Sequence, residues 1–148
     1  MNLDEFAKKL SKQTVINKIE TDIANTKKNT ALFLLKQLVD TTPVDTGKAI
    51  SNWVVDINIA PIGEIEAHHP GKKKNTHSEN KEETMFVAIQ QLENIKSDDI
   101  IHVTNNCQYI SNLNAGTSKQ AAPNFVESCI EITKKNFKSI SNIKESHG

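Results

Sequence analysis

Histidine and cysteine side chains are the groups in this sequence that could bind a metal ion. His68, His69 and His77 lie close together in the chain, and Cys107 follows later. Imidazole and thiolate are suitable zinc ligands, so these four residues define a candidate site for a metal-dependent enzyme. Their spacing, however, matches neither the HExxH pattern of a zinc-binding helix nor a zinc-finger pattern. The adjacent histidines therefore favour a solvated loop over a metal site.

A cysteine nucleophile with a histidine base is the second chemistry that the sequence allows. His102 and Cys107 are near enough in the chain to form such a pair. An outward-facing strand histidine and a small buried thiol explain the same two residues without catalysis, and we favour that interpretation. The acids Asp40, Asp45 and Asp56 are scattered and form no pair typical of general acid–base or two-metal catalysis. We therefore expect no enzyme, with no catalytic residue, no cofactor and no metal.

Lys72, Lys73 and Lys74 form the one concentrated group of positive charges in the sequence. Such a group either keeps a surface loop solvated or contacts the phosphates of a DNA duplex non-specifically. No aromatic residue lies among these lysines, which argues against stacking on single-stranded nucleic acid. All 18 basic residues of the chain are lysines, whereas bidentate readout of phosphate or guanine favours arginine.

The composition predicts one domain with a small core. A chain of 148 residues is long enough to bury roughly two-thirds of its unfolded surface. Hydrophobic residues make up 36% of the chain and aromatic residues 5%, so we expect an aliphatic core and some stabilisation from neighbouring subunits. The 18 acidic and 18 basic residues cancel, so no overall field attracts the protein to nucleic acid or membrane.

The sequence shows no pattern of a targeting or membrane segment. The first residues do not resemble a signal peptide, and no apolar run approaches the roughly 18 residues of a membrane span. Cys107 and Cys129 lie far apart without a CxxC pairing, so we expect two free thiols. These features favour a cytoplasmic protein.

Apolar periodicity predicts that the first forty residues are helical. A short first helix is indicated by apolar residues at helical spacing, namely Leu3, Phe6, Ala7 and Leu10. Thr14 is placed to cap a second helix of roughly 25 residues, over 15–39, whose apolar residues keep an i, i+3, i+4, i+7 register. A helix of that length overhangs a small core, so its polar middle would be solvated or would meet another subunit.

The rest of the chain predicts a small sheet with further helices. The turn over 40–47 breaks the long helix, and alternating residues over 53–59 predict a strand. A loop over 64–80, a helix over 81–95, a strand over 100–104, a loop over 105–124 and a helix over 125–140 follow, and 141–148 is expected to fray. We expect one α+β domain over 1–140 with a flexible basic loop at 64–80. Its long N-terminal helix and its C-terminal helix would pack on a small antiparallel or mixed β-sheet.

The segment from Asn105 to Phe125 is a low-charge polar stretch held between apolar anchors. Lys119 is its one charged residue, and Gly116 predicts a turn with positive φ. We interpret the segment as a shaped surface held against the core. The candidate subunit-interface residues on it are Tyr109, Asn114, Gly116, Thr117, Ser118, Gln120 and Pro123.

Two stretches of the chain together resemble a family of phage proteins. Thr42-Pro-Val-Asp-Thr-Gly-Lys-Ala-Ile-Ser-Asn-Trp53 is similar to the "TPVDTG…L..SW" signature of bacteriophage neck and tail-completion proteins, minor tail components at the head–tail junction. The segment from Asn105 to Glu127 resembles that family's "N..pYa..le.GtS.qaP.gfv". The order of the elements matches too, over roughly Leu32 to Phe137. The departures are a lysine in place of the common arginine after the first glycine, an extra Ala122 before Pro123, and Asn124 in place of glycine.

The resemblance implies a structural virion protein and not an enzyme. It implies a homo-oligomeric ring around the DNA channel, flanked by a portal or head-completion protein and by tail proteins, with packaged double-stranded DNA nearby and no membrane. Such a protein is assembled in the host cytoplasm and located in the virion. Lys72, Lys73 and Lys74 would then be candidate contacts with DNA in the channel. The first motif would have as its structural anchors Pro43, Asp45, Gly47 and Trp53. The alternative is a small DNA-binding protein or a metal-dependent enzyme that uses the loop at 68–77.

Overall fold

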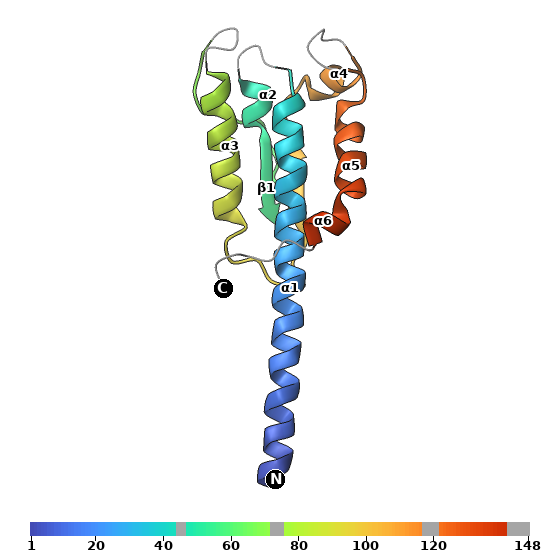
Figure 1. The fold of residues 1–148 in the computed structure, drawn as a ribbon. Helices are drawn as coiled ribbons and strands as arrows, with labels where there is room; N and C mark the ends of the chain where they lie inside the picture. The colour runs from blue at the N-terminus through green and yellow to red at the C-terminus, as the bar shows by residue number, and fades with distance from the viewer. Residues whose placement is uncertain (44–46, 72–75, 117–121, 142–148) are drawn as a thin grey trace.

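The computed structural model describes residues 1–43, 47–71, 76–116 and 122–141 of the 148-residue chain. Its dominant element is one helix, α1 (Leu3–Thr41), whose 39 residues span about 58 Å (Figure 1). The side chain of Asn2 caps the first turn by accepting a hydrogen bond from the backbone N–H of Glu5 at 2.8 Å.

The predicted division of this region into two helices is wrong. Thr14, expected to cap the second helix, lies inside α1, where its Oγ1 donates to the carbonyl of Leu10 at 2.9 Å. No proline or glycine occurs between Leu3 and Thr41, so nothing in the backbone interrupts the i→i−4 hydrogen bonds. The helix ends just before Pro43, where the turn sequence predicted its end.

The sheet consists of two antiparallel strands, β1 (Trp53–Ile57) and β2 (Ile101–Asn105). Trp53 lies opposite Asn105 at one end of the ladder, and Ile57 lies opposite Ile101 at the other. The first strand is two residues shorter than predicted because Asn58 adopts φ 68° and turns the chain. The backbone N–H of Asn58 donates to the carbonyl of Ile100 at 2.7 Å, and its Oδ1 accepts from Ile100 N at 2.9 Å.

Five more helices complete the described chain. They are α2 (Lys48–Ser51), α3 (His77–Gln91), α4 (Ile110–Asn114), α5 (Phe125–Lys135) and α6 (Phe137–Ser141). The predictions were wrong on three of these. The third helix begins four residues earlier than predicted, a short helix lies within the expected 105–124 loop, and the last helix divides at Asn136. At that break the Asn136 side chain donates back to the carbonyl of Ile132 at 2.8 Å.

The predicted α+β class is confirmed, and the core lies where α1 crosses the sheet. In Figure 1, α3 flanks α1 on one side and α5 and α6 flank it on the other, with the strands behind. The core side chains come from all of these layers: Leu35, Leu38, Val39, Ile50, Trp53, Val55, Leu92, Phe125 and Cys129. Only the second half of α1 contributes to them.

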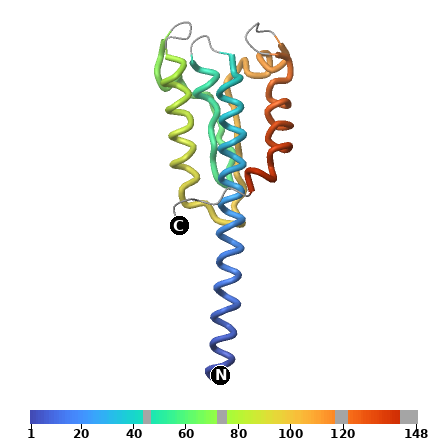
Figure 2. The backbone as a smooth tube through the Cα atoms, viewed as in Figure 1, coloured from blue at the N-terminus to red at the C-terminus, as the bar shows by residue number. Residues whose placement is uncertain are grey.

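The first half of α1 projects beyond the rest of the molecule (Figures 1 and 2). Every residue from Met1 to Ile23 is exposed, and Ala24 is the first buried one. The long helix therefore overhangs the core as expected, and we call residues 3–23 the overhang. The expectation that the polar middle of the helix is solvated or meets another subunit is wrong, because Lys27 Nζ donates to the carbonyls of Ser97 at 2.5 Å and Asp99 at 2.9 Å in the same chain. Among the residues that the structure describes, no helix is both long and apolar enough to cross a bilayer.

Candidate functional site

The two motifs meet at the end of the molecule opposite to the N-terminus. We call this the loop end and define it by α2, residues 64–71 and α4 (Figure 1). Trp53, which ends the first motif, is buried, and its Nε1 donates to Oγ1 of Thr42 at 2.8 Å. That hydroxyl in turn donates to the carbonyl of Leu38 at 2.6 Å. The tryptophan therefore fixes the start of the motif to the last turn of α1.

Asn80 is the buried polar residue that holds the loop end together. Its Oδ1 accepts hydrogen bonds from Ser51 Oγ at 3.1 Å and from the backbone N–H of His69 at 2.9 Å. Its Nδ2 donates to the carbonyls of His69 at 3.0 Å and Thr76 at 2.9 Å. Gly47, at φ 80°, lies so close that a Cβ there would collide with the Asn80 amide. The glycine of the first motif is thus required by both backbone conformation and space.

The described part of the expected 64–80 loop is bonded to the first motif. Asn52 accepts from the backbone N–H of Ile65 at 2.9 Å and donates to its carbonyl at 2.8 Å. Ser51 Oγ accepts from the N–H of His68 at 3.0 Å. These bonds hold residues 65–69 beside α2. Lys72, Lys73 and Lys74 lie outside the described residues.

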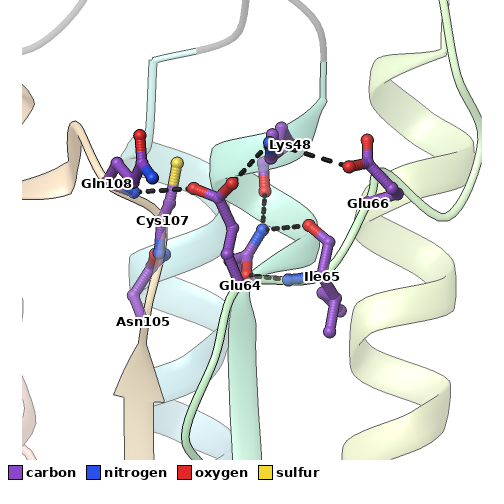
Figure 3. A network of polar contacts seen from close by, with 8 residues as sticks. Lys48, Glu64, Ile65, Glu66, Asn105, Cys107 and Gln108 are labelled. Atoms are coloured by element: carbon purple, nitrogen blue, oxygen red, sulfur yellow. Dashed lines mark hydrogen bonds and ion pairs between the residues drawn. The ribbon is translucent and has the colours of Figure 1, made fainter.

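A charged network joins the two motifs (Figure 3). Lys48 Nζ lies 2.5 Å from Glu64 Oε1, and Glu64 Oε2 accepts from the backbone N–H of Gln108 at 2.7 Å. Asn105 adds a direct link, because its Nδ2 donates to the carbonyl of Ala49 at 2.8 Å. The hydrogen bond from Lys48, followed by that from Gln108, lowers the pKa of Glu64, so the carboxylate is charged at neutral pH.

Asn114 ties the second motif to the last helices. Its Oδ1 accepts from the backbone N–H of Val126 at 3.0 Å, and its Nδ2 donates to Glu127 Oε2 at 2.9 Å. The Asn114 carbonyl accepts from Asn124 N at 2.6 Å, and Asn124 adopts φ 60° at the position where the family pattern has glycine. The hydrogen bonds of Asn114, a candidate interface residue, thus join α4 to the start of α5.

The other candidate interface residues fall into two groups. Gly116 has φ 96°, as its turn prediction requires, and it packs against Pro123. Both of these residues and Tyr109 are exposed at the loop end. Thr117, Ser118 and Gln120 lie outside the described residues, as does the anchor Asp45. Pro43 is buried beside Thr42.

The residues that could have done chemistry are dispersed. His102 lies in β2 opposite Asp56, while Cys107 is buried in the turn beyond the strand. Burial raises the pKa of the Cys107 thiol, which disfavours the reactive thiolate. Burial also lowers the pKa of His68. Within the described chain, no three His, Cys, Asp or Glu side chains gather as metal ligands would.

No known protein family, curated protein or solved structure matches this chain. The likeness to phage neck and tail-completion proteins therefore depends on the two motifs and on the order of the elements.

The sequence interpretation missed an apolar groove at the opposite end of the sheet. It has a volume of about 760 Å³ and lies between α1, the start of β2 and α6. Its apolar walls are formed by Ile19, Ile23, Leu34, Ile100, Ile101 and Phe137. Ile19 and Ile23 belong to the periodic apolar residues of the predicted helix, and both are exposed. Periodicity identifies an apolar face and not the partner that covers it.

Proposed function

We propose that this chain is a structural virion protein of a tailed phage, whose copies form a ring around the DNA channel at the head–tail junction. The observation that carries the proposal is that the two family-like motifs form one hydrogen-bonded unit. Asn105 and Ala49 are 56 residues apart in sequence and bond at 2.8 Å, and Glu64 bridges Lys48 to Gln108 beside them. Contact between two distant motifs supports their origin in one family.

The shape of the molecule adds support to this proposal. A shaped polar loop end at one pole and a projecting helix at the other give a subunit two separate surfaces for neighbours (Figure 1). In such a ring, one pole faces a portal or head-completion protein and the other a tail protein. Lys72, Lys73 and Lys74 would lie near packaged DNA and bind its phosphates without sequence preference.

The test is to look for the chain in particles. Particles purified from a lysate of the strain that encodes the chain are analysed by mass spectrometry, and the purified protein is imaged in negative stain. We expect several copies per particle and ring-shaped assemblies. A strictly monomeric protein that is absent from purified particles would contradict the proposal.

A binding titration distinguishes the proposed virion role from the alternative that the chain is a free DNA-binding protein. The full chain and a Lys72→Ser, Lys73→Ser, Lys74→Ser variant are titrated against duplex DNA at several salt concentrations. Under our proposal the free wild-type protein binds weakly and the variant still enters particles. Tight, salt-sensitive binding by the free protein, abolished in the variant, would favour the DNA-binding alternative.

A further inference from the structure

The overhang carries an apolar face that nothing in the described chain covers. Leu3, Phe6 and Leu10 occupy positions i, i+3 and i+7, which place their side chains on one side of the helix. Their exposed fractions are 84%, 52% and 54%. A helical segment of this length without packing is marginal in water, because most helical stability in proteins comes from a buried apolar face. The overhang therefore needs a partner.

The groove between α1 and β2 is also apolar and open. It needs an apolar occupant, because Ile100 at 62% and Phe137 at 48% exposure face open space in it. It follows α1 from Ile19 to Leu34, about 22 Å at 1.5 Å per residue, and a helix of about fifteen residues matches that length. Amphipathic helices bind to such grooves through anchors at i, i+3 and i+7.

The sequence segments outside the described residues offer the groove little apolar surface. The parts outside the described residues are short, and each contains at most one large aliphatic side chain, Val44 in the first and Ile143 in the last. The overhang of the same copy cannot fold back into the groove, since α1 is continuous and leads away from it (Figure 1). The occupant must therefore come from another molecule.

Charge identifies a second copy as a suitable occupant. Residues 3–18 carry four lysines against two acids, and Lys9 and Lys18 lie about 90° to either side of the apolar face. The groove is bordered by Asp22 and Asp99, and its one lysine, Lys27, already donates to the carbonyls of Ser97 and Asp99 at 2.5 and 2.9 Å. A basic amphipathic helix thus meets an apolar groove with an acidic border.

We propose that the face formed by Leu3, Phe6 and Leu10 of one copy packs into the Ile19–Ile100–Phe137 groove of a second copy. The contact joins two different surfaces, so each copy keeps one free overhang or one free groove, and repetition gives a closed ring or an open filament. The inference extends the homo-oligomeric part of the proposed function. The two fail separately: a chain found in particles that does not self-associate refutes this interface alone, and a self-associating chain absent from particles refutes the phage role alone.

The first experiment measures self-association by sedimentation velocity and native mass spectrometry of the full chain. Leu10→Asp removes the apolar face of the overhang, and Ile100→Lys removes an exposed wall of the groove. Ser11→Asp is the matched control, because it places the same charge one residue away and off the apolar face. We expect oligomers for wild type and Ser11→Asp, and at least a tenfold rise in Kd for the two interface variants.

Mixing the two interface variants distinguishes this contact from its competitors. Leu10→Asp retains an intact groove and Ile100→Lys retains an intact overhang, so an equimolar mixture forms a one-to-one heterodimer that grows no further. Phe137→Ser replaces Ile100→Lys if circular dichroism shows that the latter is unfolded. A monomeric wild type overturns the proposal. If the groove variant associates as strongly as wild type, overhangs pair with each other and the proposal is wrong. If Leu10→Asp associates as strongly as wild type, another segment fills the groove and the proposal is also wrong.

Discussion

At the scale of single residues, the loop end depends on one buried amide. Asn80 is fully buried and bonds to Ser51 in α2, to His69 before α3 and to Thr76. An amide can serve this position because it donates and accepts at the same time, which no aliphatic or charged side chain of similar size does. The fold of the first motif therefore depends on a residue outside that motif.

Replacing Asn80 tests this role. Asn80→Ala removes the side-chain partner of the buried Ser51 hydroxyl and of the partly buried His69 N–H and carbonyl, so we expect a loss of about 2–4 kcal/mol in the free energy of unfolding. Ser78→Ala, at an exposed position of the same helix, should change it by less than about 0.5 kcal/mol. Urea denaturation followed by circular dichroism measures both. Equal effects of the two changes would show that Asn80 has no special role.

Gly116 and Gly63 have similar positive φ angles, but only at Gly116 would a Cβ atom meet a neighbouring side chain. Replacing each by alanine therefore separates the cost of backbone strain from the cost of a steric clash. Gly116→Ala forces a Cβ at φ 96° to within 2.7 Å of Pro123 Cγ, and we expect a loss of about 2–3 kcal/mol. Gly63→Ala, at φ 90° with nothing within 4 Å, should cost only about 1 kcal/mol. Thermal unfolding of the two variants gives the comparison. A Gly116 variant no less stable than the Gly63 variant would contradict the close contact with Pro123.

Glu64 makes the stability of the contact between the two motifs sensitive to acid. Because its pKa lies below the ordinary 4.5 in the folded chain, its contribution to stability is complete above pH 4.5 and is lost as the pH falls through the folded value. We expect Glu64→Gln to be less stable than wild type at pH 7, with the difference shrinking as the pH falls below 4.5. Glu66→Gln, whose side chain is 90% exposed, is the matched control and should change the melting temperature little at pH 7. Melting temperatures across pH 3–7 measure the effect, and parallel curves for wild type and Glu64→Gln would refute it.

At the scale of elements, α1 has two halves with different roles. Its second half supplies Leu35, Leu38 and Val39 to the core, whereas its first 20 residues contribute no buried side chain. One continuous helix thus serves the fold at one end and presents an apolar surface at the other.

Shortening the helix tests this division. A chain without residues 1–18 should keep the melting temperature of the wild-type monomer within about 2 °C, since no core contact is lost. Leu35→Ala, at a site with no exposure, should cost about 2–5 kcal/mol. Calorimetry at low protein concentration compares them. A shortened chain that fails to fold would show that the overhang stabilises the domain from within.

At the scale of the whole molecule, the sequence predicted the class and the order of the main elements. Alternation identified β1, and the turn before Pro43 marked the end of α1, because these signals are local. The position of Asn80 could not be predicted, since its partners Ser51 and His69 are distant in sequence and its own helix began earlier than its composition indicated. The groove was missed for a similar reason: an exposed Ile19 and a buried Leu35 look alike in a periodic pattern.

The uninterrupted backbone of α1 lets the helix transmit force along its axis. Without glycine or proline from Leu3 to Thr41, the helix has no hinge, so a load applied to the overhang is transmitted along its axis. That load arrives at Thr42, whose hydroxyl joins the last turn of the helix to Trp53. Movement of a neighbour at one pole would thus be transmitted to the other, about 58 Å away, along α1.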